Sequence, residues 1–165
     1  MEPIANRIPL TNMMLAPSAS ELTGVSATML ITLAAKVLAA TDAPDLQYSG
    51  HRSLEILRQL EIDPRRFNLN PREVRAVVLR SQWFAQTVGR FLEGHPDGLC
   101  INLGCGLDVS FEELEAVGGD RFTWIDVDLP EVISIRRQFF AETSRRPIVA
   151  GDITDSIRDA AMGRR

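Results

Sequence analysis

Residues 99–108 form a short apolar run that ends in two glycines separated by one residue, Gly104 and Gly106. A strand that enters a glycine loop at the start of a helix lets the backbone approach a ligand closely. A second apolar run about twenty residues later ends in Asp126 and Asp128, and an acidic residue at this distance holds a ribose in nucleotide-binding α/β folds. Together the two segments indicate a site for an adenosine-bearing cofactor, with one of the two aspartates as its ribose ligand.

The glycine spacing narrows the class of ligand. The dinucleotide fingerprint G-x-G-x-x-G requires a third glycine, but position 109 is Val109. This disfavours a dinucleotide oxidoreductase and suits a mononucleoside ligand with no pyrophosphate. A structural alternative remains, in which Gly104 and Gly106 only form a tight turn between strand and helix.

The candidate polar residues also have structural alternatives. Asp128 is a possible cap for the helix entered at Pro130, and we favour a capping role for Asp108 over a supporting role at the site. Arg80 lies within an amphipathic helix, where an arginine is usually solvated. The sequence contains no Ser-His-Asp arrangement and no metal-ligand spacing, so we assign no catalytic residue and no metal site.

The pattern of residue types predicts three regions. Residues 1–20 contain Pro3, Pro9 and Pro17 and no clear period, which predicts an irregular arm. Residues 21–95 predict a helical region, and residues 96–165 predict a partial cofactor-binding region. The expected helices of the middle region are 25–40, 52–61 and 71–93, the last with Asn70 as its N-cap. The expected apolar stripe of this last helix is Val74, Val77, Val78, Phe84, Val88 and Phe91.

The last region alternates short apolar runs with helical patterns. The expected strands are 99–103, 122–127 and 147–150, and the expected helices lie near 109–117, 131–142 and 154–162. This alternation predicts a parallel sheet with helices on its faces, and hence an α/β fold with N-terminal helices and a Rossmann-like sheet of about three strands.

Composition limits the function classes. The 165 residues carry a net charge of −4, which gives no support to binding of nucleic acid or a membrane surface. No signal peptide is evident, and the longest apolar stretch is interrupted by Lys36 and too short to span a bilayer. Cys100 and Cys105 lie about 17 Å apart in an extended strand, too far for a disulfide. We therefore expect reduced cysteines and a cytoplasmic protein.

Two motifs carry a resemblance to a known family. The segment N-L-G-C-G-L-D at 102–108, followed by W-I-D-V-D-L-P-E-V-I at 124–133, resembles the leucine carboxyl methyltransferase family, which includes polyketide O-methyltransferases of the tetracenomycin type. The resemblance extends over residues 24–155. It implies a class I methyltransferase fold, S-adenosylmethionine as cofactor, and methyl transfer to a carboxylate or hydroxyl of a small molecule.

The resemblance also implies roles for single residues. Gly104 would lie against the cofactor, and Asp128 would hold its ribose. Asp152 and Ile153 would flank the adenine. Two basic residues would bind the carboxylate of the methionine part, Arg80 by its match to a helix arginine of the family and Lys36 by its match to a family lysine.

The chain also departs from this family. An aspartate often found around positions 49–51 is missing here, and family members continue with further strands and a substrate-binding region beyond Arg165. We therefore expect a truncated chain that lacks its acceptor half, and an open sheet edge that favours a homo-oligomer. The alternative function is a non-catalytic methyltransferase-like binding or oligomerisation module.

Overall fold

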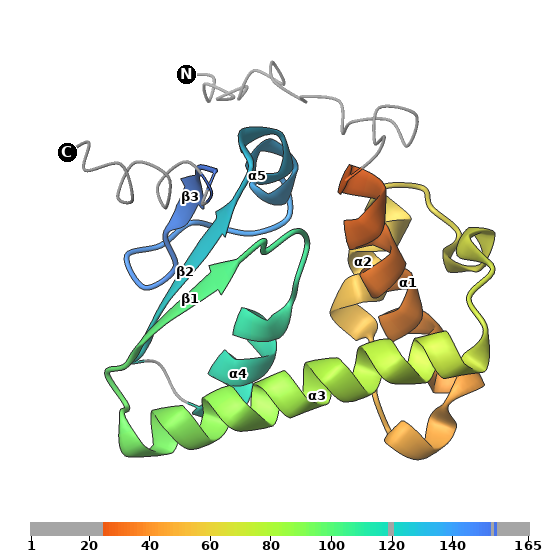
Figure 1. Ribbon diagram of the computed structural model, residues 1–165, viewed down its shortest axis with the longest axis horizontal. Coiled ribbons are helices and arrows are strands. Elements are labelled where there is room, and N and C mark those ends of the chain that lie inside the picture. The colour runs from red at the N-terminus through yellow and green to blue at the C-terminus, as the bar shows by residue number, and fades with distance from the viewer. Residues whose placement is uncertain (1–24, 119–120, 153, 155–165) are drawn as a thin grey trace, which may run out of the picture.

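Helix α1 (Val25–Asp42) forms the centre of the helical region. The computed structural model describes residues 25–118, 121–152 and 154 (Figure 1). Leu33, Ala34, Ala35 and Ala39 of α1 are at most 1% exposed, as expected for a helix that is apolar around most of its circumference. None of the described helices, α1 included, has the length and apolar character needed to cross a membrane.

Two further helices pack on α1. Helix α2 (His51–Gln59) lies between the 3-10 turns η1 (Pro44–Leu46) and η2 (Pro64–Phe67), and helix α3 (Pro71–Gly94) follows. The predicted start of α3 is confirmed: the Asn70 side chain accepts hydrogen bonds from the backbone of Arg72 and Glu73, and the Glu73 side chain accepts one from the Asn70 amide. This reciprocal pair satisfies donors that the helix itself leaves unpaired.

Helix α3 runs along both halves of the molecule (Figure 1). Its N-terminal half buries Val74 and Val78 against α1, and its C-terminal half buries Leu92 against the sheet half. The predicted apolar stripe is buried only in part, because the side chains of Phe84 and Phe91 are 53% and 42% exposed. Because α3 packs against the helical region with one half and against the sheet half with the other, no single face of this helix is covered along its whole length.

The sheet half alternates strands and helices in chain order. It contains β1 (Leu99–Leu103), α4 (Ser110–Gly118), β2 (Thr123–Asp128), α5 (Pro130–Arg136) and β3 (Ile148–Ala150). The three strands are parallel in the order β1-β2-β3, which confirms the α/β prediction.

One predicted helix of the sheet half is shorter in the structure. The helix expected near 131–142 ends earlier, at Arg136, because the chain then turns tightly and brings the buried Phe140 ring against the Arg136 guanidinium group. The helix expected at 154–162 and the irregular arm at 1–20 lie outside the described residues.

The two faces of the sheet differ in burial. Leu103, Val127 and Val149 are register partners on one face, where Leu103 is 57% and Val149 45% exposed. Asp126 and Ile148 are register partners on the other face and are at most 2% exposed. Within the described part of the chain, the first face therefore has no continuous cover.

A shared core joins the two halves. One cluster of buried side chains includes Leu33 of α1, Ile56 and Leu57 of α2, Ile133 of α5 and Ile148 of β3. Leu107, from the loop after β1, belongs to the same cluster. The loop that follows the first strand is therefore packed against the helical region.

Candidate functional site

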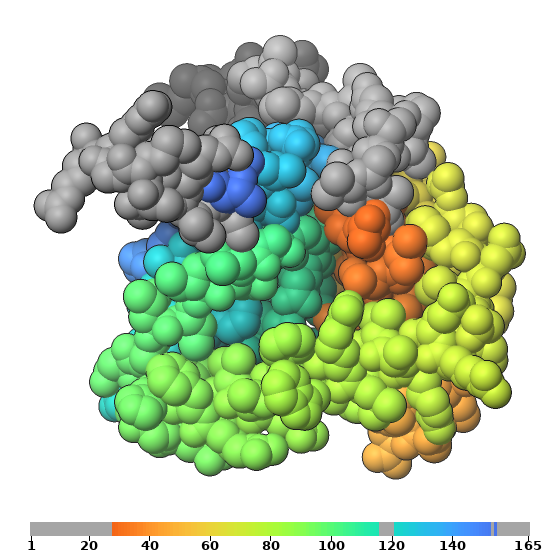
Figure 2. Space-filling model, viewed as in Figure 1, coloured from red at the N-terminus to blue at the C-terminus, as the bar shows by residue number. Residues whose placement is uncertain are grey.

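A cavity of about 700 Å³ lies between α1, α3 and the loop that follows β1. Figure 2 shows the surface hollowed where these elements meet. Four residues predicted for the cofactor site line this cavity, although they come from different segments of the chain: Lys36, Arg80, Gly104 and Asp128. The carboxyl ends of parallel strands, where β1 and β2 deliver two of them, are the usual place for a ligand in open α/β sheets.

Both glycines of the loop have left-handed backbone conformations, with φ of 66° at Gly104 and 48° at Gly106. Side chains other than glycine rarely adopt such values. A Cβ atom at Gly104 would meet no atom within 4 Å, whereas one at Gly106 would lie 3.1 Å from the Cβ of Met29. The backbone at Gly104 is therefore open to a ligand, and Gly106 is also needed for contact with α1.

The Asp128 carboxylate joins the ends of the first two strands. Its Oδ2 accepts a hydrogen bond from the Gly106 amide at 2.7 Å, and its Oδ1 accepts one from the Leu129 amide at 2.8 Å. The capping alternative is not observed, since α5 has Leu129 as its N-cap and no side-chain cap. An ionised carboxylate has about four acceptor positions, so Asp128 keeps capacity for two hydroxyl groups.

Asp126 is excluded as a ligand by its surroundings. Its side chain is completely buried, and its Oδ2 accepts hydrogen bonds from Arg136 Nη2 at 2.8 Å and Arg146 Nε at 3.0 Å. Its Oδ1 accepts from Asn102 Nδ2 and Trp124 Nε1, each at 3.0 Å. Of the two aspartates that the sequence offered, only Asp128 lines the cavity.

Lys36 brings a buried positive charge to the wall of the cavity. Its Nζ lies 3.3 Å from Asp108 Oδ1, and the Lys36 side chain is only 3% exposed. Burial would by itself raise the pKa of Asp108, but the Lys36 ammonium and hydrogen bonds from Ser110 and Lys36 lower it below its usual value. Asp108 therefore has both roles considered for it. It accepts a hydrogen bond from the first amide of α4, at Ser110, and it also accepts one from Lys36, a residue that lines the cavity.

The Tyr48 ring also packs beside the Lys36 ammonium group. Lys36 Nζ lies 5.9 Å from the ring centroid, and the Tyr48 hydroxyl donates a hydrogen bond to Glu113. Burial and this carboxylate raise the pKa of Tyr48. The phenol is therefore neutral and leaves Asp108 as the counter-ion of Lys36.

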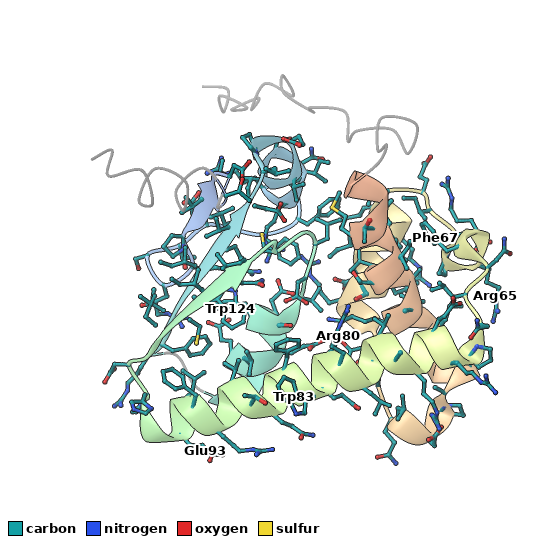
Figure 3. The ribbon with its side chains drawn as sticks, in the orientation of Figure 1. Arg65, Phe67, Arg80, Trp83, Glu93 and Trp124 are labelled. Carbon is teal, nitrogen blue, oxygen red and sulfur yellow. The ribbon has the colours of Figure 1, made fainter. Side chains whose placement is uncertain are left out.

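Arg80 lies midway along α3, as Figure 3 shows, and its side chain is exposed to the cavity. Among the residues that the structure describes, no acceptor lies within hydrogen-bond or ion-pair distance of its guanidinium group. Phe84, one helical turn further on, lines the same cavity. Arg80 is solvated, as its structural alternative stated, and it is also available to an anionic ligand.

Asp152 lies just after β3, at the same edge of the sheet as the glycine loop. It is exposed and accepts hydrogen bonds from the Thr154 amide at 2.8 Å and the Thr154 hydroxyl at 2.7 Å. It is not among the residues that line the cavity in the described part of the chain. Ile153 lies outside the described residues, so both adenine contacts stay predictions.

The two cysteines are free, as predicted. Cys105 is buried in the glycine loop, and burial raises the pKa of its thiol to about 12. Cys100 is half-buried in β1, and burial raises its pKa as well. Across the described residues, no group of three His, Cys, Asp or Glu side chains could hold a metal ion.

Sequence reasoning missed two cavity residues that the fold supplies. Phe84 belongs to the predicted apolar stripe, although its spacing of four from Arg80 places both residues on one helix face. No local pattern indicates Met29, because its contact with Gly106 depends on how α1 packs against the loop. The helical spacing therefore indicates Phe84 as a cavity residue, whereas no sequence pattern indicates Met29.

Comparison with known proteins identifies a relative of this chain. Over 133 residues, the chain is 32% identical to a tetracenomycin polyketide synthesis O-methyltransferase, TcmP, of Streptomyces glaucescens. The match covers 81% of this chain and 48% of that protein, so the chain spans about half the length of this relative. No family model matches the chain. The identity supports a methyltransferase-like relationship.

Proposed function

We propose that this chain forms the cofactor-binding part of an S-adenosylmethionine-dependent O-methyltransferase of the leucine carboxyl methyltransferase family. The observation that carries the proposal is the meeting of Lys36, Arg80, Gly104 and Asp128 around one cavity. The similarity to an O-methyltransferase supports the same reaction class.

The donor set fits the parts of this cofactor. Arg80, with no acceptor in the described residues, and the buried Lys36 would bind the methionine carboxylate, since a guanidinium fork matches a carboxylate well. Asp128 would accept hydrogen bonds from the ribose hydroxyls. The open backbone at Gly104 would allow close contact with the cofactor, and Asp152 and Ile153 would flank the adenine.

The bound cofactor supplies an electrophilic methyl group on a sulfonium, so the protein needs mainly to position and desolvate the reactants. Phe84, Val88 and Leu114 provide apolar lining that would exclude water from the cavity. A carboxylate acceptor attacks without a base, whereas a hydroxyl acceptor requires one. We infer a small-molecule acceptor of one of these two classes, and we assign no catalytic base among the described residues.

Calorimetric titration of this chain with S-adenosylhomocysteine, which keeps the adenosine and amino acid parts of the cofactor, tests the proposal. We expect saturable binding with one site per chain. No heat of binding at millimolar ligand would overturn the proposal and leave the alternative of a non-catalytic module. A titration with NAD serves as the control, and we expect no binding because the loop lacks the third glycine.

A further inference from the structure

Arg136 lies beneath the glycine loop and contacts it from the side away from solvent. The residue ends α5, and its side chain is 0% exposed. Its Nη1 donates a hydrogen bond to the Gly106 carbonyl at 2.8 Å and lies 3.5 Å from the Cys105 carbonyl, at the outer limit of a hydrogen bond. Its Nη2 donates to the Asp108 carbonyl at 3.0 Å. One guanidinium group therefore contacts three carbonyls of one loop.

The guanidinium is itself held in place. Nη2 also donates to Asp126 Oδ2 at 2.8 Å, and the Phe140 ring centroid lies 4.2 Å from the guanidinium carbon. Arg146 shares Asp126 at 3.0 Å and lies near Glu112. The two buried arginines therefore share the Asp126 carboxylate, while the partly exposed Glu112 near Arg146 also pairs with Arg52 at 3.0 Å. A fixed charge that points a planar fork at carbonyl groups is a rigid support.

The loop is thus held from two sides. Arg136 binds the Gly106 carbonyl, and Asp128 accepts from the Gly106 amide at 2.7 Å. The two contacts hold the two peptide planes that meet at the left-handed Gly106, one through its carbonyl and one through its amide. Without the Arg136 contact, the Asp128 carboxylate would bind a loop that is held on one side only.

We propose that Arg136 is a positioning residue for cofactor binding, which acts by fixing the backbone of residues 105–108 and, through the Gly106 amide, the Asp128 carboxylate. It does not line the cavity and need not touch the ligand. This inference rests on the proposed function for its ligand, but the fixing of the loop is a property of the chain alone.

The matched pair of variants is Arg136→Lys and Arg146→Lys. Both keep a positive charge beside Asp126, but only Arg136 contacts the loop carbonyls. A lysine has a single point charge and cannot bridge two carbonyls and a carboxylate with fixed geometry. We expect Arg136→Lys to weaken S-adenosylhomocysteine binding about tenfold and Arg146→Lys to leave it within about twofold. Circular dichroism and thermal unfolding define a temperature at which both variants are folded.

Amide hydrogen exchange provides a measurement that does not depend on the ligand. In Arg136→Lys, we expect faster exchange at Gly106, while exchange in the core of α1 stays as in Arg146→Lys. If the unsubstituted chain binds no S-adenosylhomocysteine, the proposed function fails, and this measurement alone decides whether Arg136 fixes the loop. Equal loss of affinity in both variants, or unchanged exchange at Gly106 in Arg136→Lys, overturns the inference.

A third measurement covers the case in which Arg136→Lys does not fold. In the unsubstituted chain, a guanidinium held by two carbonyls and a carboxylate gives separate, slowly averaging Nη proton signals. We expect this pattern for Arg136 in nuclear magnetic resonance spectra, in contrast to the solvent-exposed Arg90. Freely averaging Arg136 signals contradict the inference.

Discussion

The Lys36 ammonium and the Asp108 carboxylate lie 3.3 Å apart, although 72 positions separate them in the chain. Lys36 comes from the centre of α1 and Asp108 from the loop after β1. The pair therefore joins the helical region to the sheet half at the wall of the cavity. The Lys36 side chain is 3% exposed and that of Asp108 is 30% exposed, so the pair is largely removed from solvent.

Removal of the Lys36 charge should destabilise the protein. A buried carboxylate that loses its partner keeps its desolvation cost, so we expect Lys36→Met to lower the free energy of unfolding by about 1–3 kcal/mol. The control is Arg75→Met, which breaks the exposed pair between Arg75 and Asp45 and should cost less than about 1 kcal/mol. Urea denaturation at neutral pH measures both values. Equal losses of unfolding free energy in the two variants would show that the pair of Lys36 and Asp108 stabilises the protein no more than an exposed pair does.

The same pair predicts a pH dependence of stability. The pKa of Asp108 is lowered in the folded protein, so the unfolded chain binds this proton more tightly. The contribution of Asp108 to the free energy of unfolding is therefore present above the ordinary aspartate pKa of about 4 and is lost as pH falls through the folded pKa. We expect the stability difference between the unsubstituted chain and Lys36→Met to shrink on acidification. A difference that is constant from neutral pH to about pH 3 contradicts this assignment.

The sequence predicts the glycine loop and the alternation of strands and helices better than the roles of single side chains. Gly104 and Gly106 are local signals, because a left-handed turn between strand and helix requires glycine. The choice between Asp126 and Asp128 is not local. Both follow one apolar run, but Asp126 is buried by arginines that arrive from α5 and from the segment before β3. Only the tertiary packing separates a structural aspartate from one that lines a cavity.

The exposure of Phe84 is a second example. Its residue type favours a core position, but α3 spans both halves of the molecule and leaves its middle turns uncovered beside the cavity. Arg136 is also buried, although arginine side chains are usually exposed. The local pattern that indicates its burial is its position after three apolar residues of α5, Val132, Ile133 and Ile135.

If the proposed site is correct, substitution of Arg80 weakens the binding of S-adenosylhomocysteine without loss of stability. Arg80 makes no hydrogen bond or ion pair with the described residues, so its removal leaves no buried partner. We expect Arg80→Ala to weaken binding of S-adenosylhomocysteine about tenfold, which is the value of a charge-assisted hydrogen bond. The matched control is Arg90→Ala, since Arg90 is exposed on the same helix and does not line the cavity. Equal affinities for the two variants would remove Arg80 from the site.

Asp128→Asn tests the ribose contact separately. Asparagine keeps the size of the side chain and one acceptor oxygen but lacks the charge, so we expect weaker binding of S-adenosylhomocysteine, again about tenfold. Binding of S-adenosylhomocysteine that lacks the ribose 2′-hydroxyl provides the control. The substitution should cost less affinity with this analogue, because it lacks a hydroxyl that we propose Asp128 to bind. An equal loss with both ligands would mean that Asp128 acts only by holding Gly106.

The Cys105 thiol should resist alkylation in the folded protein. Burial raises its pKa to about 12, so the reactive thiolate is rare at neutral pH, and the residue is only 2% exposed. We expect N-ethylmaleimide to modify Cys100 before Cys105, with both modified rapidly in concentrated guanidinium chloride. Peptide mass spectrometry locates the label. Faster labelling of Cys105 than of Cys100 would show that the glycine loop opens often enough to expose its thiol.

The uncovered sheet face should favour self-association. Ile101 and Leu103 of β1 are 56% and 57% exposed, and β1 is an edge strand of the three-stranded sheet in the described part of the chain. An apolar face beside an unpaired edge is a template for contact with another chain, so we expect a concentration-dependent dimer or larger species. Light scattering measures the molar mass at each protein concentration.

Ile101→Lys should shift the equilibrium to monomer, because it places a charge on this face. The control Thr87→Lys places the same charge on an exposed position of α3, and it should leave association unchanged. A monomer at every concentration of the unsubstituted chain, or equal effects of the two substitutions, contradicts a role for this face.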